Sequence, residues 1–316
     1  MPQKAKTSSN TIRLGLIQHA SPPDVPAAKN LKKAMDMMRD AASQGCTLLL
    51  TQELFTAHYF CQVEDAAMFA LAQTIPGPTS EKLCALAKKL KVEIAASLFE
   101  KRTQGVFHNT TIVINAKGVI IGKYRKMHIP DDPRFYEKFY FTPGDAGAPA
   151  PGRPHPRGNA EAHAGWQVHQ LANAKMGTLI CWDQWYPEAA RLTALRGAQI
   201  LTYPTAIGYA HHIEPADEPA RQAESWQTMM RSHAIANGVF VATINRIGVE
   251  GELTFWGQSF VADPGGRVIA QASPDQEEIL AVDCDLSLID KLRVNWPFLR
   301  DRRIDAYGDL TKRFID

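Results

Sequence analysis

The stretch MGTLICWDQWYPEAARLTALRGAQILTYP, residues 176–204, decides the fold class. It begins with a short apolar run at 176–181 and closes with a second one at 198–204. Such runs are typical of strands that are covered on both faces. Residues 185–197 between them are predicted to be a helix, because Pro187 suits a first helical turn and Glu188 suits the positive end of the helix dipole. A strand, a helix and a strand in this order predict an α/β domain.

The same alternation continues on both sides of this stretch. Apolar residues at spacings of three and four predict further helices over 26–44, 79–91 and 219–237. Further strands are expected at 12–20, 46–53, 92–98, 107–115, 118–126, 238–245, 253–263, 266–271 and 277–285. This order predicts one α/β domain with a large mixed sheet or two stacked sheets, flanked by helices.

The rest of the chain divides around that domain. Residues 12–292 are expected to form a single domain, preceded by a disordered segment at 1–11. Residues 144–165 are dense in Gly, Pro and Ala, which predicts a surface loop or a partly disordered insertion and not a domain boundary. The tail at 293–316 is charged with spaced aromatic residues, and we expect it to pack on the surface or on a partner chain.

Composition excludes several classes of protein. The 316 residues are 45% apolar and 22% charged, as in ordinary globular proteins. Thirty-five basic and 33 acidic residues give a net charge of +2, so the chain lacks the basic excess of a nucleic-acid binder. No apolar run approaches the roughly 18 residues of a membrane span, and the polar start is not a secretory signal. Five scattered cysteines without CxxC spacing indicate neither a disulfide framework nor a zinc site, and they favour a reducing, cytoplasmic location.

Three reactive side chains come at or just after the ends of apolar strands: Glu53, Lys126 and Cys181. The carboxyl ends of strands are where active sites assemble in open α/β sheets. Taken singly, these residues are most simply explained as a helix cap, a solvated lysine and a core thiol. Together they offer a base that can take the proton of a thiol and a cation that can stabilise an oxyanion. The corner before the helix also places Cys181 near helix amides, which stabilise a thiolate.

Four segments give the chain a family resemblance. GLIQ (15–18), TQELF (51–55), YRKMHIP (124–130) and ICWDQWYPEAAR (180–191) resemble the nitrilase or carbon–nitrogen hydrolase superfamily. The resemblance extends from about residue 12 to 310, and the insertion is its main departure. It implies a four-layer αββα sandwich of two stacked mixed sheets flanked by helices. It also implies a homodimer, or a larger homo-oligomer, formed through the helices that follow the nucleophile.

The resemblance assigns roles to four residues. It implies Glu53 as general base, Lys126 as the cation that stabilises the oxyanion and Cys181 as nucleophile. It further implies a second glutamate near the lysine, which Glu137 matches within YEKFYFTPGD. The implied reaction is hydrolysis through a thioester-type covalent intermediate, without a metal or another cofactor.

Within the superfamily, the segments HIPDD, FYEKFYFTPGD, CWDQWYPEAAR and YPTAIG most resemble the N-carbamoylputrescine amidohydrolase branch. The resemblance implies release of putrescine, carbon dioxide and ammonia from a ureido compound. Gln184 and Trp185 stand where N-carbamoyl-amino-acid hydrolases carry arginines that bind a carboxylate. We therefore expect a small cationic substrate, and neither a nucleic acid nor a membrane as partner. The alternatives are a nitrilase, an aliphatic amidase or an N-carbamoyl-amino-acid hydrolase, or else a catalytically silent scaffold of the same fold.

Four residues near the motifs are candidates for substrate binding. Tyr59, Trp182 and Trp185 offer aromatic faces to an ammonium group. Asp183 either pairs with the ammonium or only caps the following helix. The acidic residues Glu64, Asp131, Asp132 and Glu188 lie in or near the same segments. The predicted helices also carry an apolar set that we expect at a homodimer interface: Tyr186, Leu192, Leu195, Trp226, Met229 and Met230.

Overall fold

The computed structural model describes residues 10–145, 165–210 and 216–315. The segment expected to be disordered, 1–11, and the insertion at 144–165 lie almost wholly outside these ranges, so both stay predictions. Within the described ranges, no helix is both long and apolar enough to cross a membrane.

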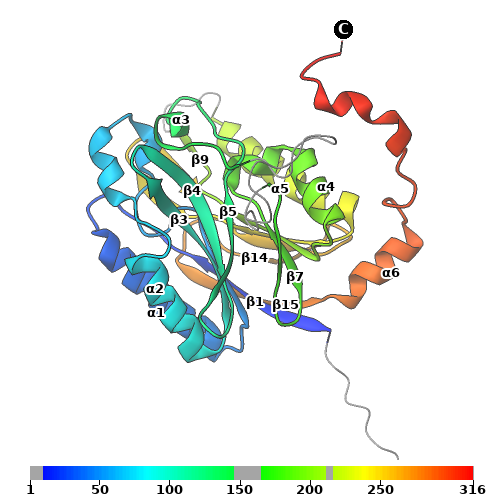
Figure 1. Cartoon of the computed structure of the whole chain (residues 1–316), viewed down its shortest axis with the longest axis horizontal. Helices are drawn as coiled ribbons and strands as arrows, with labels where there is room; N and C mark the ends of the chain where they lie inside the picture. Colours follow the sequence, from blue (N-terminus) through cyan, green and yellow to red (C-terminus); the bar gives the residue numbers. More distant parts are fainter. Residues whose placement is uncertain (1–9, 146–164, 211–215, 316) are drawn as a thin grey trace, which may run out of the picture.

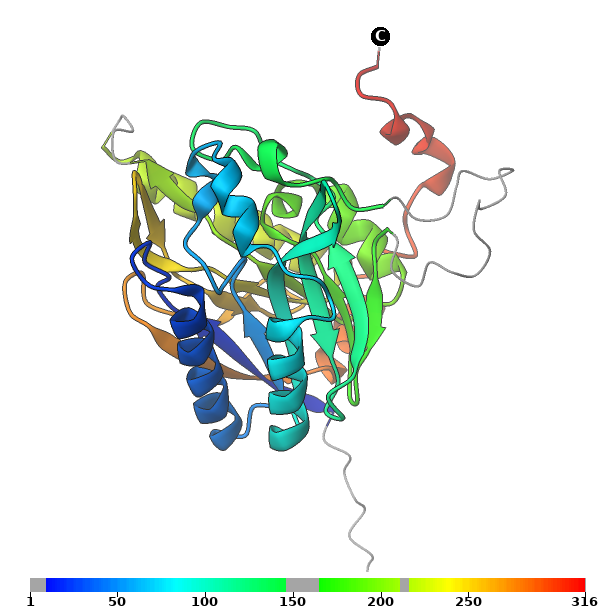
Figure 2. The same cartoon turned by 60° about the vertical axis from the view of Figure 1, so that its left-hand side comes forward.

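Two six-stranded sheets form the centre of the molecule (Figures 1 and 2). In the first sheet the order is β15 (Glu278–Asp285), β1 (Thr11–Gln18), β2 (Leu48–Thr51), β3 (Glu93–Thr103), β4 (Val106–Ile114) and β5 (Ile120–Arg125). In the second it is β14 (Val268–Gln271), β13 (Phe260–Ala262), β10 (Phe240–Ile244), β8 (Ile200–Pro204), β7 (Lys175–Thr178) and β6 (Val168–Gln170). A small third sheet holds β11 (Ile247–Glu250), β12 (Leu253–Trp256) and β9 (Gly208–Ala210).

Helices cover the outer face of each large sheet. The first sheet carries α1 (Ala27–Ser43) and α2 (Pro78–Leu90), which lie side by side in Figure 2. The second carries α4 (Pro187–Leu195) and α5 (Glu218–Asn237). The short α3 (Glu137–Tyr140) and the late α6 (Ser287–Asn295) complete the helices of the described chain.

Three apolar clusters hold these layers together. Between the sheets, residues such as Leu14 and Leu50 of the first sheet pack with Phe240 of the second. Outside them, Met38 of α1 belongs to a cluster on the first sheet, and Trp226 of α5 belongs to a cluster on the second. Helix, sheet, sheet and helix are thus stacked in four layers, and the predicted αββα sandwich is confirmed.

Two element boundaries differ from the sequence prediction for local reasons. The strand expected over 253–263 is two strands, because Gly257 and Gln258 both adopt positive φ (56° and 54°) and the chain passes there from the small sheet to the second large one. The helix expected over 185–197 runs from Pro187 to Leu195, and an unpredicted 3₁₀ turn (Cys181–Trp185) precedes it.

The predicted dimer surface is only partly available. Trp226 and Met230 are buried in the chain's own core, at 1% and 0% exposure, so the prediction that they face a partner is wrong. Leu192 and Leu195 of α4 are exposed. The chain after α6 extends beyond the body of the molecule (Figure 1) and exposes several large apolar side chains: Trp296, Phe298, Ile304, Leu310, Phe314 and Ile315.

Candidate active site

The predicted trio meets at the carboxyl ends of strands from both large sheets. Glu53 follows β2 by two residues, Lys126 follows β5 directly, and Cys181 follows β7 by three residues. β2 is parallel to β3, while β4 is antiparallel to both β3 and β5, so β2 and β5 run in the same direction. The topology therefore places the base and the cation at one edge of the first sheet, as expected for an α/β site.

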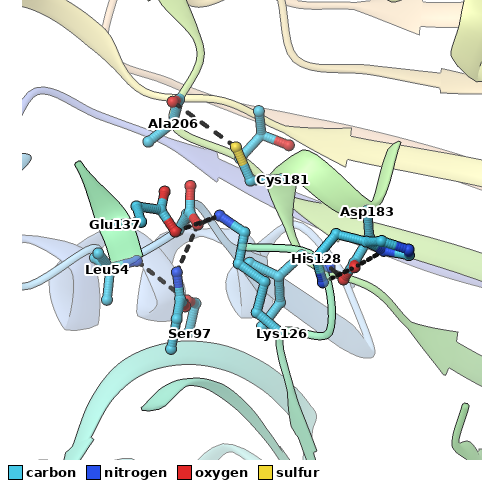
Figure 3. A network of polar contacts seen from close by, with 12 residues as sticks. Leu54, Ser97, Lys126, His128, Glu137, Cys181, Asp183 and Ala206 are labelled. Atoms are coloured by element: carbon cyan, nitrogen blue, oxygen red, sulfur yellow. Dashed lines mark hydrogen bonds and ion pairs between the residues drawn. The ribbon is translucent and has the colours of Figure 1, made fainter. Parts of the chain in front are cut away.

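Lys126 is the centre of a buried charge cluster. Its Nζ donates to Glu53 Oε1 at 2.9 Å and to Glu137 Oε2 at 2.7 Å (Figure 3). All three side chains are fully buried. The hydroxyl of Tyr59 donates to the other oxygen of Glu137 at 2.7 Å. A buried ion costs several kcal/mol unless it is well paired, and here one ammonium is paired with two carboxylates.

This arrangement shifts the proton affinities of the cluster. Burial alone would lower the pKa of Lys126, but the carboxylates of Glu137 and Glu53 outweigh it and hold that pKa well above its usual value. Burial, helped by the nearby charge of Glu53, raises the pKa of Glu137 to about 7. Lys126 is therefore a fixed cation, whereas Glu137 titrates near neutral pH.

Cys181 lies at the start of the 3₁₀ turn and is 5% exposed. Its Sγ points toward the carbonyl oxygen of Ala206, at 3.9 Å. Burial, together with the negative charge of Glu53, raises the pKa of the Cys181 thiol well above its usual value. The expected stabilisation of a thiolate by helix amides is thus outweighed, and the resting group is a thiol. A base must take its proton when the sulfur attacks.

Glu53 keeps one oxygen available for that proton. Its Oε1 accepts from Lys126 and also from Asn109 Nδ2, at 2.6 Å. Its Oε2 is buried and has no hydrogen-bond partner among the described residues. A buried acceptor without a partner is rare in stable structures and common in functional sites. The arrangement therefore suits a general base.

Asp183 turns away from this chemistry. It is fully buried, and each of its oxygens already has partners. Oδ2 accepts from the Ile180 N–H at 2.9 Å and from the Tyr124 hydroxyl at 2.7 Å. Oδ1 accepts from the His128 N–H at 3.0 Å and lies 2.7 Å from His128 Nδ1. Asp183 therefore has no free oxygen for a substrate ammonium, and the predicted contact with substrate is wrong. The alternative, that it caps the following helix, is also wrong, because Asp183 caps the 3₁₀ turn at Cys181–Trp185 and makes no cap bond to α4.

A cavity of about 710 Å³ opens in front of Cys181. Of the predicted site residues, Glu137, Cys181, Trp182 and Trp185 line it, whereas Glu53, Tyr59, Lys126 and Asp183 do not. Of the four further acidic candidates, only Asp132 is in its wall. The wall also contains residues that the sequence analysis did not select for substrate binding: Phe135, Gln184, Tyr209, Glu218, Arg221 and Gln222.

Gln184 is held in one orientation at this wall. Its Oε1 accepts from Trp226 Nε1 at 2.8 Å, and an indole nitrogen can only donate. Its Nε2 is buried and has no hydrogen-bond partner in the described part of the chain. Gln184 is consequently a neutral wall residue that offers N–H donors.

The sequence profile of the family described as carbon-nitrogen hydrolase matches residues 13–294. The chain belongs to this family. It is 39% identical to an N-carbamoylputrescine amidase of Solanum lycopersicum over 94% of this chain and 93% of that one. It is 37% identical to a citrullinase of Francisella tularensis over 91% and 94%. A solved carbon-nitrogen hydrolase from Helicobacter pylori has 42% identity and a TM-score of 0.87, covering 96% of this chain and all of that one.

Sequence reasoning missed part of the carbon–nitrogen hydrolase site. Asn109 was not selected by the sequence analysis, yet it donates to Glu53. Arg246, which directly follows Asn245 at the end of an apolar strand, lies behind Glu53. The rule that selected the trio, a reactive side chain after an apolar strand, would also have selected Arg246. Among the described residues, no group of three or more His, Cys, Asp or Glu could hold a metal ion, and the expectation of metal-free chemistry stays a prediction.

Proposed function

We propose that the chain is a cysteine-dependent hydrolase that cleaves the ureido group of N-carbamoylputrescine and releases putrescine, carbon dioxide and ammonia. The observation that carries the proposal is the buried Lys126, paired with Glu53 and Glu137, at a cavity that the Cys181 thiol lines. The similarity to N-carbamoylputrescine amidases over nearly the whole chain supports the choice of substrate.

The first step is attack by the thiol. The free Oε2 of Glu53 takes the proton of Cys181 as the sulfur bonds to the ureido carbon, because the resting thiol is not ionised. The negative charge moves to the carbonyl oxygen, where Lys126 and the backbone N–H of Trp182 stabilise it. Glu137 accepts from Lys126 and so holds that ammonium in place.

The second step breaks the carbon–nitrogen bond and then the thioester. The protonated Glu53 gives its proton to the departing nitrogen, and a carbamoyl group that keeps the other nitrogen remains on Cys181. Glu53 next takes a proton from a water molecule, whose oxygen bonds to the carbonyl carbon while the sulfur leaves with that proton. The carbamic acid that is released loses carbon dioxide. Either order of departure of the two ureido nitrogens gives the same products.

The cavity wall favours a cationic tail. Gln184 and Trp185 cannot neutralise a carboxylate, so an acid tail buried beside them would leave an unpaired charge. Asp132 and Glu218 line the cavity and carry negative charge. Trp182 adds an aromatic face to the same wall. These groups suit an ammonium through ion pairing and cation–π contact.

A ureido amino acid such as citrulline is a second candidate substrate. Arg221 and Glu218 both line the cavity, and Arg221 Nη1 lies 3.1 Å from Glu218 Oε2. Such a pair can match the carboxylate and the ammonium of a zwitterionic head group. The similarity to a citrullinase supports this alternative. Arg221→Gln should then weaken citrulline turnover and leave N-carbamoylputrescine turnover largely unchanged.

Steady-state ammonia release from a panel of compounds tests the proposal. The panel contains N-carbamoylputrescine, citrulline, N-carbamoyl-β-alanine, an N-carbamoyl-D-amino acid, an aliphatic amide and a nitrile. We expect kcat/KM for N-carbamoylputrescine to exceed that for each N-carbamoyl acid at least about tenfold, because Asp132 and Trp182 can contact an ammonium whereas Gln184 and Trp185 cannot neutralise a carboxylate. An equal or reversed preference would refute the cationic substrate, and no release from any compound would indicate a silent scaffold.

We also propose that the chain works in the cytoplasm as a homodimer or larger homo-oligomer, without a nucleic-acid or membrane partner. All five cysteines are free, which supports a reducing compartment. The exposed Leu192 and Leu195 of α4, close after the nucleophile, support a contact between copies of the chain. The near-neutral net charge of +2 supports the absence of a nucleic-acid partner.

A further inference from the structure

A buried arginine holds the backbone that carries Glu53. Arg246 follows β10 and has 0% exposure. Its Nη2 donates to the carbonyl oxygen of Glu53 at 2.7 Å and to that of Leu54 at 3.3 Å. Its Nη1 donates to the carbonyl oxygen of Ala57 at 3.2 Å. One guanidinium from a distant part of the chain therefore fixes three carbonyl groups within five residues.

The turn held in this way is strained. Leu54 has a φ of +48°, a left-handed conformation that a branched side chain rarely adopts. The Leu54 N–H donates to Ser97 Oγ at 3.1 Å, and the Glu53 N–H donates to the carbonyl oxygen of Thr205 at 3.3 Å. Strained backbone persists only where surrounding contacts over-determine it. Arg246 supplies the hydrogen bonds to the carbonyl oxygens of this turn, while Ser97 and Thr205 accept from its N–H groups.

The charge of Arg246 has one buried carboxylate beside it. Glu250 is 1% exposed and accepts from Arg246 Nη1 with both oxygens, at 2.9 and 3.0 Å. The ring of Phe255 lies 5.3 Å from the guanidinium carbon. Buried ion pairs are often no more stabilising than apolar residues of the same size. A gain in folding stability alone therefore does not explain why a charged pair occupies this buried position.

Glu250 links the arginine to the second catalytic carboxylate. Its Oε2 accepts from the backbone N–H of Tyr59, and the hydroxyl of Tyr59 donates to Glu137 at 2.7 Å. Glu137 and Glu53 both accept from Lys126. The contacts thus form a closed ring that runs from Arg246 through Glu250, Tyr59, Glu137, Lys126 and Glu53 back to Arg246.

We propose that Arg246 and Glu250 are a positioning pair that fixes the two carboxylates on either side of Lys126. Arg246 acts on Glu53 through its carbonyl oxygen, and Glu250 acts on Glu137 through Tyr59. Neither residue lines the cavity in front of Cys181. The pair affects turnover by holding geometry, and only the choice of assay substrate rests on the proposed function.

Two variants and one matched control test the pair. Arg246→Lys keeps the charge but cannot span three carbonyl groups and a carboxylate, and Glu250→Gln removes the counter-charge. Glu100→Gln is the control, because Glu100 is also buried (2% exposed) and accepts from both Nε and Nη2 of Arg125, outside the ring. We measure kcat, KM and the thermal midpoint for each protein on N-carbamoylputrescine.

We expect kcat to fall at least about tenfold in Arg246→Lys and Glu250→Gln, with KM changed less than about threefold, because misplacement of a catalytic group slows chemistry more than binding. Glu100→Gln should lower the thermal midpoint and keep kcat within about twofold of wild type. A folded Arg246→Lys protein with wild-type kcat would overturn the proposal. An equal loss of kcat in the control would also overturn it. If one variant does not fold, the other decides.

A crystal structure separates this proposal from the choice of substrate. In Arg246→Lys we expect the carboxylate of Glu53 to leave its position 2.9 Å from Lys126 Nζ. An unmoved Glu53 would overturn the positioning role, whichever compound the enzyme cleaves. If the wild-type protein does not cleave N-carbamoylputrescine, the proposed function fails. The variants are then compared by structure, and by kinetics on the compound of the panel that is cleaved.

Discussion

The backbone at Cys181 has a φ of +42°, which is unusual for a residue with a side chain. Such a conformation costs on the order of 1–3 kcal/mol and recurs at functional sites. Here it occurs at the corner between β7 and the 3₁₀ turn, where it brings the sulfur to the cavity wall. The same burial that excludes water raises the pKa of the thiol, so in the proposed mechanism Cys181 depends on Glu53 for activation.

Cys181→Ser should keep the fold and lose at least roughly three decades of kcat, because a hydroxyl is much less acidic than a thiol and Glu53 is too weak a base to ionise it. Cys84→Ser is the control, since Cys84 is half-buried on α2 and lines none of the site. Ammonia release and a circular dichroism spectrum provide the measurements. Near wild-type turnover in Cys181→Ser would show that the proposed mechanism is wrong.

Lys126→Met should abolish measurable turnover, because it removes a charge that stabilises the transition state by about 3–4 kcal/mol in comparable oxyanion sites. It also leaves Glu53 and Glu137 buried without a cation, so the thermal midpoint should fall as well. The control is Lys123→Met on β5, the strand that Lys126 directly follows. Lys123 is half-buried, and its Nζ lies 3.3 Å from Glu100 Oε1. If Lys126→Met keeps a normal kcat but has a lowered thermal midpoint, Lys126 contributes to stability and not to catalysis.

Glu137 predicts the pH dependence of the reaction. Because burial raises its pKa to about 7, kcat/KM should increase with pH through that value, as Glu137 ionises and accepts fully from Lys126 and Tyr59. No decrease is expected up to about pH 9, because Lys126 and Cys181 both lose their protons only well above their usual values. In Glu137→Gln the acidic limb near 7 should disappear and the plateau should be lower. An unchanged limb in that variant would assign it to another group.

The role of a single residue could be predicted where that role follows from the neighbouring sequence, and could not where it depends on residues far away in the chain. The position of Glu53, Lys126 and Cys181 after apolar strands can be seen in the chain itself, and the structure brings Glu53 and Lys126 into contact. Asp183 was ambiguous, because an acidic residue after a nucleophile can cap a turn or face a ligand. Arg246 donates to the carbonyl oxygen of Glu53, which lies 193 residues away in the chain. A local sequence pattern can select Arg246 as a reactive residue, but it cannot predict this distant partner.

At the scale of elements, the periodic segments were predicted well and the corners were not. All the helices expected from apolar spacing are present, since burial of one face against a sheet determines them. The 3₁₀ turn at Cys181–Trp185 was not predicted, although the helix that follows it was. Its conformation depends on contacts with Asp183 from Tyr124 and His128, which belong to the first sheet and the loop after it.

Asp183 therefore joins the element that carries the nucleophile to the one that carries Lys126. Asp183→Asn has nearly the same shape but replaces one acceptor with a donor, which must then face an N–H or a hydroxyl donor. We expect kcat to fall at least about tenfold with little change in KM, because the 3₁₀ turn that carries Cys181 and the segment that carries Lys126 lose their relative position. Tyr124→Phe removes a single bond to the same carboxylate and should have a smaller effect. Unchanged kcat in Asp183→Asn would mean that this carboxylate contributes only to stability.

At the scale of the whole molecule, the exposed apolar side chains are concentrated late in the chain and on α4. Val294, Ile304 and Phe314 are each more than 70% exposed, and Leu195 is 46% exposed. Soluble proteins seldom leave such surface open unless a partner covers it. α4 begins six residues after Cys181, so a partner on this helix would also support the turn that carries the nucleophile.

We accordingly expect light scattering at micromolar concentration to give at least twice the 35.0 kDa of one chain. Leu195→Asp should shift the protein toward the monomer, because a charge at a two-fold apolar contact faces its own copy. Val119→Asp is the matched control, since Val119 is 53% exposed in the turn between β4 and β5, away from α4. A wild-type monomer would refute the assembly. If Leu195→Asp remains a dimer, α4 does not form the interface. The exposed apolar tail after α6 would then be the surface that forms it.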